Sequence, residues 1–303
     1  MPLAGVTDMT YLSLMLTPSR RLTTMQERPA PRPSLLDLRN AATLAAHAAG
    51  EVLMRRFRTK LRVDEKPGQG LVTNADFESE RAALKSLHST FPDFGILTEE
   101  SDGKKAQSPG RWILDPLDGT TNYAHGLTTF CVSIAGEWNG EIVVGAIFHP
   151  TSGEMYTAMR GKGSFIDGRR MRVSTTPELR DAFLSTGFSS RKDKWLTQEI
   201  ATFERLSRKS NGVRRPGSAA LDLAQVARGV FDGFWERGLS AWDVAAGSLM
   251  IEEAGGKVSD FKGNALRLDG GEVLCSNGAI HRALVHEIRG SLAHESRDSG
   301  TSH

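Results

Sequence analysis

The sequence predicts an α/β protein of layered α+β type, in which an α+β half is followed by an α/β half. Apolar residues recur at three- and four-residue steps over residues 34–53, which is the period of a helix. Short apolar runs separated by turns follow over residues 95–160, and helices alternate with single strands in the last third of the chain. Runs of strands and then alternating elements are typical of two halves that differ in kind. We place the boundary near residues 175–180.

Length and composition exclude several classes of protein. The chain has 303 residues, of which 39% are hydrophobic, so it can bury a large core and is not disordered as a whole. The 38 Lys and Arg minus 36 Asp and Glu leave a net charge of +2, which offers no bulk attraction for nucleic acid or a membrane surface. No apolar run approaches the roughly 20 residues that a membrane-spanning helix requires. Cys131 and Cys275 exclude a disulfide scaffold and favour free core thiols, so we expect a soluble, cytoplasmic protein.

Hydrophobic periodicity and turn residues place the elements in order along the chain. Helices are expected over residues 34–53, 75–88, 194–206, 218–228, 242–253 and 278–289. Strands are expected over residues 95–98, 112–114, 130–137, 142–149, 154–160, 230–234 and 273–275.

The two ends of the chain read differently from the rest. Residues 1–33 contain a short apolar run and then a proline-rich stretch, which favours a disordered extension, or Met25 as the true start. Residues 295–303 are polar and are expected to be a disordered tail. Residues 34–177 would then form the N-terminal half and residues 178–294 the C-terminal half.

An acidic segment follows the apolar run 112–114. Pro116 favours an extended conformation at Asp115, which places this carboxylate at a strand end. Asp118 lies three residues further on, and Gly119 allows a tight turn into residues 120–122, whose hydroxyl, amide and N–H groups suit an anion. This arrangement is what a metal-bridged phosphate needs. The alternative is that the two aspartates only accept hydrogen bonds from turn N–H groups.

Further acids occur in matching settings. Glu99 and Glu100 follow an apolar pair at the end of an expected strand, Glu236 lies shortly before Asp243, and Asp76 and Asp243 stand where helices begin. The last two each follow a Ser or Thr by three residues, so a helix capping box explains either of them singly. Taken together, the acids favour a shared site.

Several converging carboxylates require a counter-charge. Two of them about 4 Å apart repel by roughly 4 kcal/mol at an effective dielectric constant near 20. All-oxygen ligands favour Mg²⁺ or Mn²⁺ rather than zinc. The histidines show no zinc-binding spacing; they are residues 47, 88, 125, 149, 281, 286, 294 and 303.

With these motifs the chain resembles the inositol monophosphatase family of lithium-sensitive, Mg²⁺-dependent sugar phosphatases. One family signature is matched by residues 112–122, and a second by residues 242–247 with 253–256. Shorter matches lie at residues 98–101 and 71–76. The resemblance extends from about residue 34 to residue 289. It implies an αβαβα sandwich of the inositol monophosphatase/fructose-1,6-bisphosphatase type, assembled as a homodimer.

The resemblance also implies roles for individual residues. Two to three Mg²⁺ ions, with Mn²⁺ as a substitute, would be held by Glu99, Asp115, the carbonyl of Leu117, Asp118 and Asp243, the last from the C-terminal half. The catalytic residues would be Asp76, Thr120 and Glu99, which position the attacking water. The substrate would contact Gly119, Thr120, Thr121, Gly217, Ser218, Ala219, Glu236 and Asp243, and Lys66 would lie near the site.

The implied reaction is hydrolysis of a small-molecule phosphate monoester by direct, in-line attack of metal-activated water. The preferred substrate is myo-inositol 1-phosphate. Histidinol phosphate, fructose 1,6-bisphosphate and 3′-phosphonucleotides remain alternatives, because relatives share the metal core and differ in loops that correspond to residues 185–193 and 211–218. A metal-dependent regulatory module without turnover is the alternative from another class. Neither a membrane nor a nucleic acid is needed as a partner.

Overall fold

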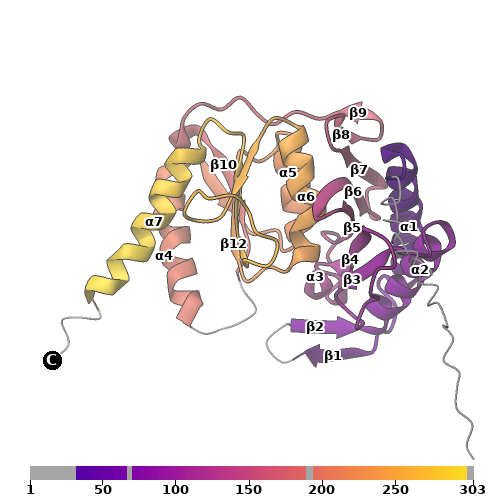
Figure 1. The fold of residues 1–303 in the computed structure, drawn as a ribbon. Helices are drawn as coiled ribbons and strands as arrows, with labels where there is room; N and C mark the ends of the chain where they lie inside the picture. Colours follow the sequence, from indigo (N-terminus) through magenta and orange to yellow (C-terminus); the bar gives the residue numbers. More distant parts are fainter. Residues whose placement is uncertain (1–31, 67–69, 189–193, 299–303) are drawn as a thin grey trace, which may run out of the picture. The chain divides into compact units, whose positions relative to one another are not determined.

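The computed structural model describes residues 32–66, 70–188 and 194–298, which form two β-sheets and three helix pairs (Figure 1). The helices are α1 (Leu35–Arg56), α2 (Asn74–Thr90), α3 (Thr120–Ala124), α4 (Lys194–Lys209), α5 (Ala219–Ala227), α6 (Ala241–Glu253) and α7 (His281–Asp298). A single 3₁₀ turn, Leu179–Asp181, lies in the connection between the sheets.

The first sheet has seven strands in chain order. They are β3 (Gly95–Thr98), β4 (Gly110–Asp118), β5 (Cys131–Trp138), β6 (Glu141–His149), β7 (Glu154–Met159), β8 (Gly163–Ile166) and β9 (Arg169–Arg170). Only β3 and β4 are parallel, and every later pair is antiparallel. Separately, β1 (Val63–Lys66), which is largely exposed, pairs antiparallel with β2 (Gly70–Thr73), whose Val72 and Thr73 are buried.

The second sheet has five strands in the order β11-β10-β12-β14-β13. They are β10 (Phe183–Thr186), β11 (Gly212–Arg214), β12 (Gly233–Arg237), β13 (Lys257–Ser259) and β14 (Glu272–Ser276). Strands β11, β10 and β12 are mutually parallel, whereas β14 is antiparallel to both β12 and β13.

The helix pairs complete five layers. Helix α1 packs on α2 and on β5, β6 and β7, and its small buried side chains allow this close approach: Ala41, Ala42, Ala45, Ala46 and Ala49. Helices α5 and α6 lie between the sheets, and α4 packs against α7 on the outer face of the second sheet (Figure 1). A helix that is apolar on all sides must be buried, as α6 is from Val244 to Ile251. The layers confirm the αβαβα sandwich expected from the sequence.

Two expected strands need correction. The strand expected at 112–114 continues to Asp118, so both aspartates belong to β4. The strand expected at 230–234 begins only at Gly233, because residues 230 and 231 complete the exit from α5: their N–H groups donate to the carbonyl of Gln225, after Gly229 at φ 79° has ended the helix.

The expected tails fall largely outside the described residues. This holds for residues 1–31 of the expected extension and for residues 299–303 of the expected tail. Helix α7 continues past its expected end at residue 289 to Asp298. Over the described part of the chain, no helix has both the length and the apolar character that crossing a membrane demands.

Candidate active site

An irregular pairing at the end of β4 brings two aspartates to one face of the sheet. Asp115 pairs with Ser133 of β5, and Asp118 pairs with Cys131, so one extra residue is accommodated on β4. In a regular strand, residues three apart point to opposite faces. The extra residue removes this alternation, and Pro116, which has no N–H to give to the sheet, lies within the bulge.

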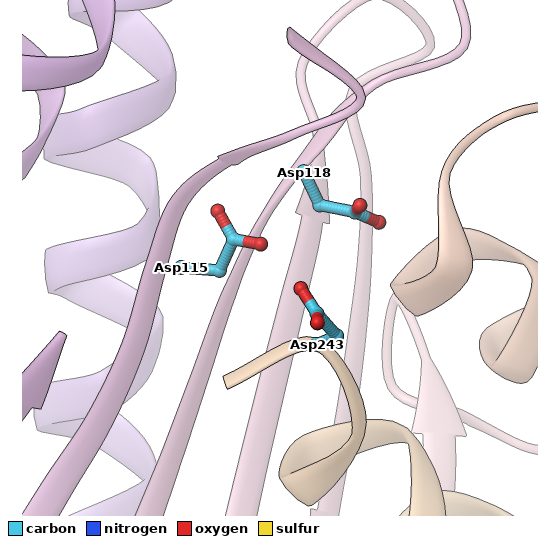
Figure 2. A group of neighbouring side chains, drawn as sticks. All are labelled: Asp115, Asp118 and Asp243. Carbon is cyan, nitrogen blue, oxygen red and sulfur yellow. The ribbon is translucent and has the colours of Figure 1, made fainter. Parts of the chain in front are cut away.

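A third carboxylate meets these two from the other half of the sequence. Asp243 lies in the first turn of α6, and the carboxylates of Asp115, Asp118 and Asp243 each offer an oxygen within 4.8 Å of the others. The three side chains point toward one another (Figure 2). One oxygen of Asp115 accepts the N–H of Leu117 at 2.9 Å, and one oxygen of Asp243 accepts the N–H of Ser240 at 2.6 Å.

Asp118 holds the start of α5. Its Oδ2 accepts the hydroxyl of Ser218 at 2.6 Å and the N–H of Ala220 at 2.7 Å. Ser218 is the N-cap residue, but its side chain makes no cap bond to its own helix, so a carboxylate from β4 caps α5 instead. Because a helix N-terminus carries partial positive charge, this contact favours the ionised carboxylate.

Asp76 links α2 to the turn after β4. Its Oδ2 accepts both the N–H and the hydroxyl of Thr73, which forms the expected capping box. Its Oδ1 lies 3.0 Å from the hydroxyl of Thr120, and the same hydroxyl lies 3.0 Å from the carbonyl of Leu117. The capping boxes at residues 73 and 240 are both present, so each acid caps a helix and also faces the site.

Glu99 lies beside the three aspartates rather than among them. It follows β3, and its carboxylate is 3.7 Å from the ammonium of Lys66. The same ammonium lies 2.5 Å from Glu100, whose side chain is only 1% exposed. The charge of Glu99 still reaches Asp115, where it raises the pKa of that carboxyl together with burial.

Crowding of acids raises their pKa values throughout the cluster. Burial raises the pKa of Asp115 well above its ordinary value, and the neighbouring carboxylates add to the rise. Burial and the charge of Asp118 raise the pKa of Asp243 to about 7. Burial, Glu100 and Asp243 raise that of Glu99 to about 8, against the opposing charge of Lys66. A set of ionised oxygen ligands in so small a volume fits a hard divalent cation.

The turn into α3 has the shape that the sequence predicts but distributes its polar groups differently. Gly119 has φ 95°, and a Cβ there would lie 2.9 Å from the carbonyl of Thr129. The amide of Asn122 was expected to face an anion, but it donates to the carbonyls of Thr129, Pro216 and Gly217, because these carbonyls surround it. Thr121 is exposed on the outer side of the helix.

Two acids lie on the side of the cluster toward the second sheet. Glu236 on β12 was expected, whereas Asp222 on α5 was not; it is 2% exposed, and its only sequence signal is an acid inside an apolar helix. Burial first, and then Glu236 and Asp118, raise the pKa of Asp222 well above its ordinary value. Of the other expected substrate residues, Ser218 and Ala219 are buried at the start of α5, and Gly217 precedes them at φ 89°.

Comparisons with known proteins point to one family. The model of the inositol monophosphatase family matches residues 35–293. An inositol-1-monophosphatase from Mesorhizobium japonicum is 43% identical over 259 residues, covering 84% of this chain and 97% of that protein. A Nus factor SuhB from Pseudomonas aeruginosa is 39% identical over 260 residues, covering 84% and 96%.

A solved structure gives the same result. The inositol monophosphatase from Anabaena (Nostoc) sp. PCC 7120 has a TM-score of 0.76 and 42% identity, covering 84% of this chain and 96% of that one. The chain therefore belongs to the inositol monophosphatase family and is a phosphatase of that type.

Proposed function

We propose that this phosphatase hydrolyses the monophosphate ester of a polyol, with myo-inositol 1-phosphate as the first candidate, and that Mg²⁺ supports the reaction. The observation that carries the proposal is the meeting of three carboxylates within 4.8 Å, next to a hydroxyl–carboxylate pair. Leu117 links the two groups, since its N–H donates to Asp115 and its carbonyl lies 3.0 Å from the hydroxyl of Thr120. A protein that only binds its ligand has no need of the hydroxyl–carboxylate pair formed by Thr120 and Asp76.

Asp115, Asp118 and Asp243, supported by Glu99 and the carbonyl of Leu117, would hold two to three Mg²⁺ ions, with Mn²⁺ as a substitute. The chemistry that Mg²⁺ supplies when bound is neutralisation of the phosphoryl oxygens and a lowered pKa for the attacking water. The chain keeps its own ligands ready, because backbone and hydroxyl donors fix one oxygen of Asp115, Asp118 and Asp243. We call these residues, with Asp76 and Thr120, the phosphate side.

Asp76 and Thr120 orient the attacking water. The Thr120 hydroxyl donates its proton to Asp76 Oδ1, which leaves its oxygen lone pairs available to accept a hydrogen bond from water. Asp76 can then take up a proton that passes through this hydroxyl. Its other oxygen is held by Thr73, so the direction of the acceptor is fixed before substrate binds.

Glu236 and the start of α5 would receive the leaving alcohol. Glu236 lies at the end of β12 and is partly buried, so its carboxylate can accept a hydrogen bond from a substrate hydroxyl. We call Glu236, Asp222 and the neighbouring strand ends of the second sheet the alcohol side. A polyol suits this side, because its hydroxyl groups can both donate to and accept from carboxyl groups whose pKa values are raised.

The test is release of inorganic phosphate from myo-inositol 1-phosphate, histidinol phosphate, fructose 1,6-bisphosphate and a 3′-phosphonucleotide, with Mg²⁺ and with EDTA. We expect Mg²⁺-dependent release that is fastest with the inositol ester. Thr120→Val, which removes one hydroxyl at constant shape, should lower kcat about 100-fold. Thr151→Val is the matched control, since its hydroxyl donates to Thr128 in a distant turn. Undiminished release in EDTA, or equal kcat in Thr120→Val, would refute the proposal.

The second candidate is a regulatory role without turnover, as the name Nus factor of some relatives suggests for those proteins. The basic surface of α4 gives less support to a regulatory role than the acidic site gives to hydrolysis. The basic residues of α4 are largely paired with acids: Arg205 and Lys209 with Glu287, and Arg208 with Glu204. A chain that binds Mg²⁺ but releases no phosphate from any of the four esters would favour this alternative.

A further inference from the structure

Three parallel strands of the second sheet end in a row beside the alcohol side. Ser185 of β10 pairs with Arg214 of β11, and Thr186 of β10 pairs with Trp235 of β12. Continuing these registers by one residue places Gly187 beside Glu236 and Arg215 beside Thr186, so the three lie near the same edge with Arg215 one position short of the other two. In open α/β sheets, ligands bind at the carboxyl ends of parallel strands, because loops and side chains converge there.

The residues at this edge are in close contact. A Cβ on Gly187 would overlap the carboxylate of Glu236, so the glycine leaves room for that side chain. Phe188 follows, and its ring is 5.8 Å from that of Phe203 on α4, edge to face. The guanidinium of Arg215 lies 5.1 Å from the centre of the Phe188 ring. Arg215 is thus held over a fixed aromatic ring beside Glu236.

Arg215 brings a positive charge close to the acidic side chain of Glu236. The pKa of Glu236 is raised by burial and by the charges of Asp243, Asp118 and Glu199, while Arg215 opposes these effects. Arg215 is exposed, and across the described residues no acidic side chain lies within 4 Å of its guanidinium to form an ion pair. Its hydrogen-bond donors are therefore available to a ligand that binds next to Glu236.

We propose that Arg215 is a specificity-determining residue that binds a second anionic group on the leaving alcohol, at the end of the alcohol side away from the three aspartates. The inference rests on the proposed function and deepens it: among esters of one sugar, the one whose leaving alcohol carries a phosphate or carboxylate for Arg215, beside a hydroxyl for Glu236, has the higher kcat/KM.

The experiment compares two esters of the same sugar, fructose 1-phosphate and fructose 1,6-bisphosphate, with the full-length Mg²⁺ enzyme. The quantity measured is the ratio of kcat/KM for the bisphosphate to kcat/KM for the monophosphate, with release from C1 followed in both. We expect the ratio to fall about tenfold in Arg215→Ala, since a charge-assisted contact to phosphate is lost. Because both esters are measured on one preparation, partial unfolding of a variant lowers both kcat/KM values by the same factor and leaves their ratio unchanged.

Arg214→Ala is the matched control. Arg214 is the last residue of β11 and directly precedes Arg215, but its guanidinium lies 4.9 Å from the Phe183 ring and donates to the carbonyl of Val213. The ratio should be unchanged in this variant. An unchanged ratio in Arg215→Ala, or an equal fall in both variants, would overturn the inference. If the inference is overturned but Mg²⁺-dependent release from the inositol ester persists, the proposed function stands. If no ester is hydrolysed, the inference and the proposed function both fail.

Discussion

The phosphate side and the alcohol side of the site hold their acids in different ways. On the phosphate side, Asp76, Asp115, Asp118 and Asp243 each accept at least one hydrogen bond from a backbone N–H. On the alcohol side, no hydrogen bond from the described residues reaches the carboxylate of Asp222 or Glu236. The first set is fixed before substrate binds. Glu236 has no such hydrogen bond, so under the proposed function its carboxyl group is available to a hydroxyl group of the substrate.

The largest effect should come from breaking the phosphate side. Asp115→Asn keeps the acceptor for the N–H of Leu117 but removes the charge at the centre of the cluster. We expect a loss of kcat/KM of about 1000-fold, since several kcal/mol of charge stabilisation disappear. The measurement is phosphate release over a Mg²⁺ titration. Asp93→Asn, in the exposed turn before β3, is the control. Full activity in Asp115→Asn would show that this aspartate holds no metal.

The acids of the phosphate side could be found from the sequence, because their positions are set locally. Asp115 and Asp118 follow an apolar run, and Asp76 and Asp243 stand three residues after a capping Thr or Ser. The capping role and the catalytic role are compatible, since one carboxylate oxygen can accept the N–H of the N-cap residue while the carboxylate faces the site. The bulge that aligns Asp115 with Asp118 was missed, because it depends on the register between β4 and β5.

The alcohol side was less accessible to sequence reasoning. Glu236 was noted only as an acid shortly before Asp243 and received its role from the family resemblance, and Asp222 was hidden in an apolar helix. The proximity of Arg215, Gly187 and Glu236 depends on pairing among three strands that are separate in the sequence, and β10 and β11 were not expected as strands at all. Each has four residues or fewer, which is too short for a clear periodic pattern. The α+β half followed by an α/β half was predictable because the helices are long and periodic, whereas the αβαβα layering came from the family resemblance.

Gly187→Ala should change the alcohol side alone and so separate the two sides. The added methyl group overlaps the carboxylate of Glu236 and must displace it. We expect KM for myo-inositol 1-phosphate to rise about tenfold, in keeping with a steric cost of about 1–3 kcal/mol. An aryl phosphate without hydroxyl groups should be affected much less. Gly212→Ala is the control, because its added methyl group meets no atom closer than 3.5 Å. Equal effects on both esters would mean that the two sides are not independent.

The smallest expected effect concerns stability without metal. Asp222 is buried, and its pKa is raised well above its ordinary value by burial, Glu236 and Asp118. A raised folded-state pKa means that the stability linked to the protonated form is present below the unfolded-state pKa and is lost as pH rises through the folded-state pKa. Asp222→Asn should therefore increase the free energy of unfolding in EDTA at pH 8, by about 1 kcal/mol, and the gain should shrink toward pH 4.

Urea unfolding of the metal-free protein at both pH values measures this gain, with Asp118→Asn as the contrasting variant on the phosphate side. The carboxylate of Asp118 accepts hydrogen bonds from Ser218 and Ala220 at the start of α5, so its replacement should gain less than that of Asp222, or lose stability. A larger gain for Asp118→Asn than for Asp222→Asn would remove the distinction between hydrogen-bonded and unbonded acids. The two substitutions remove the same charge, so any difference between them reports how each carboxylate is held.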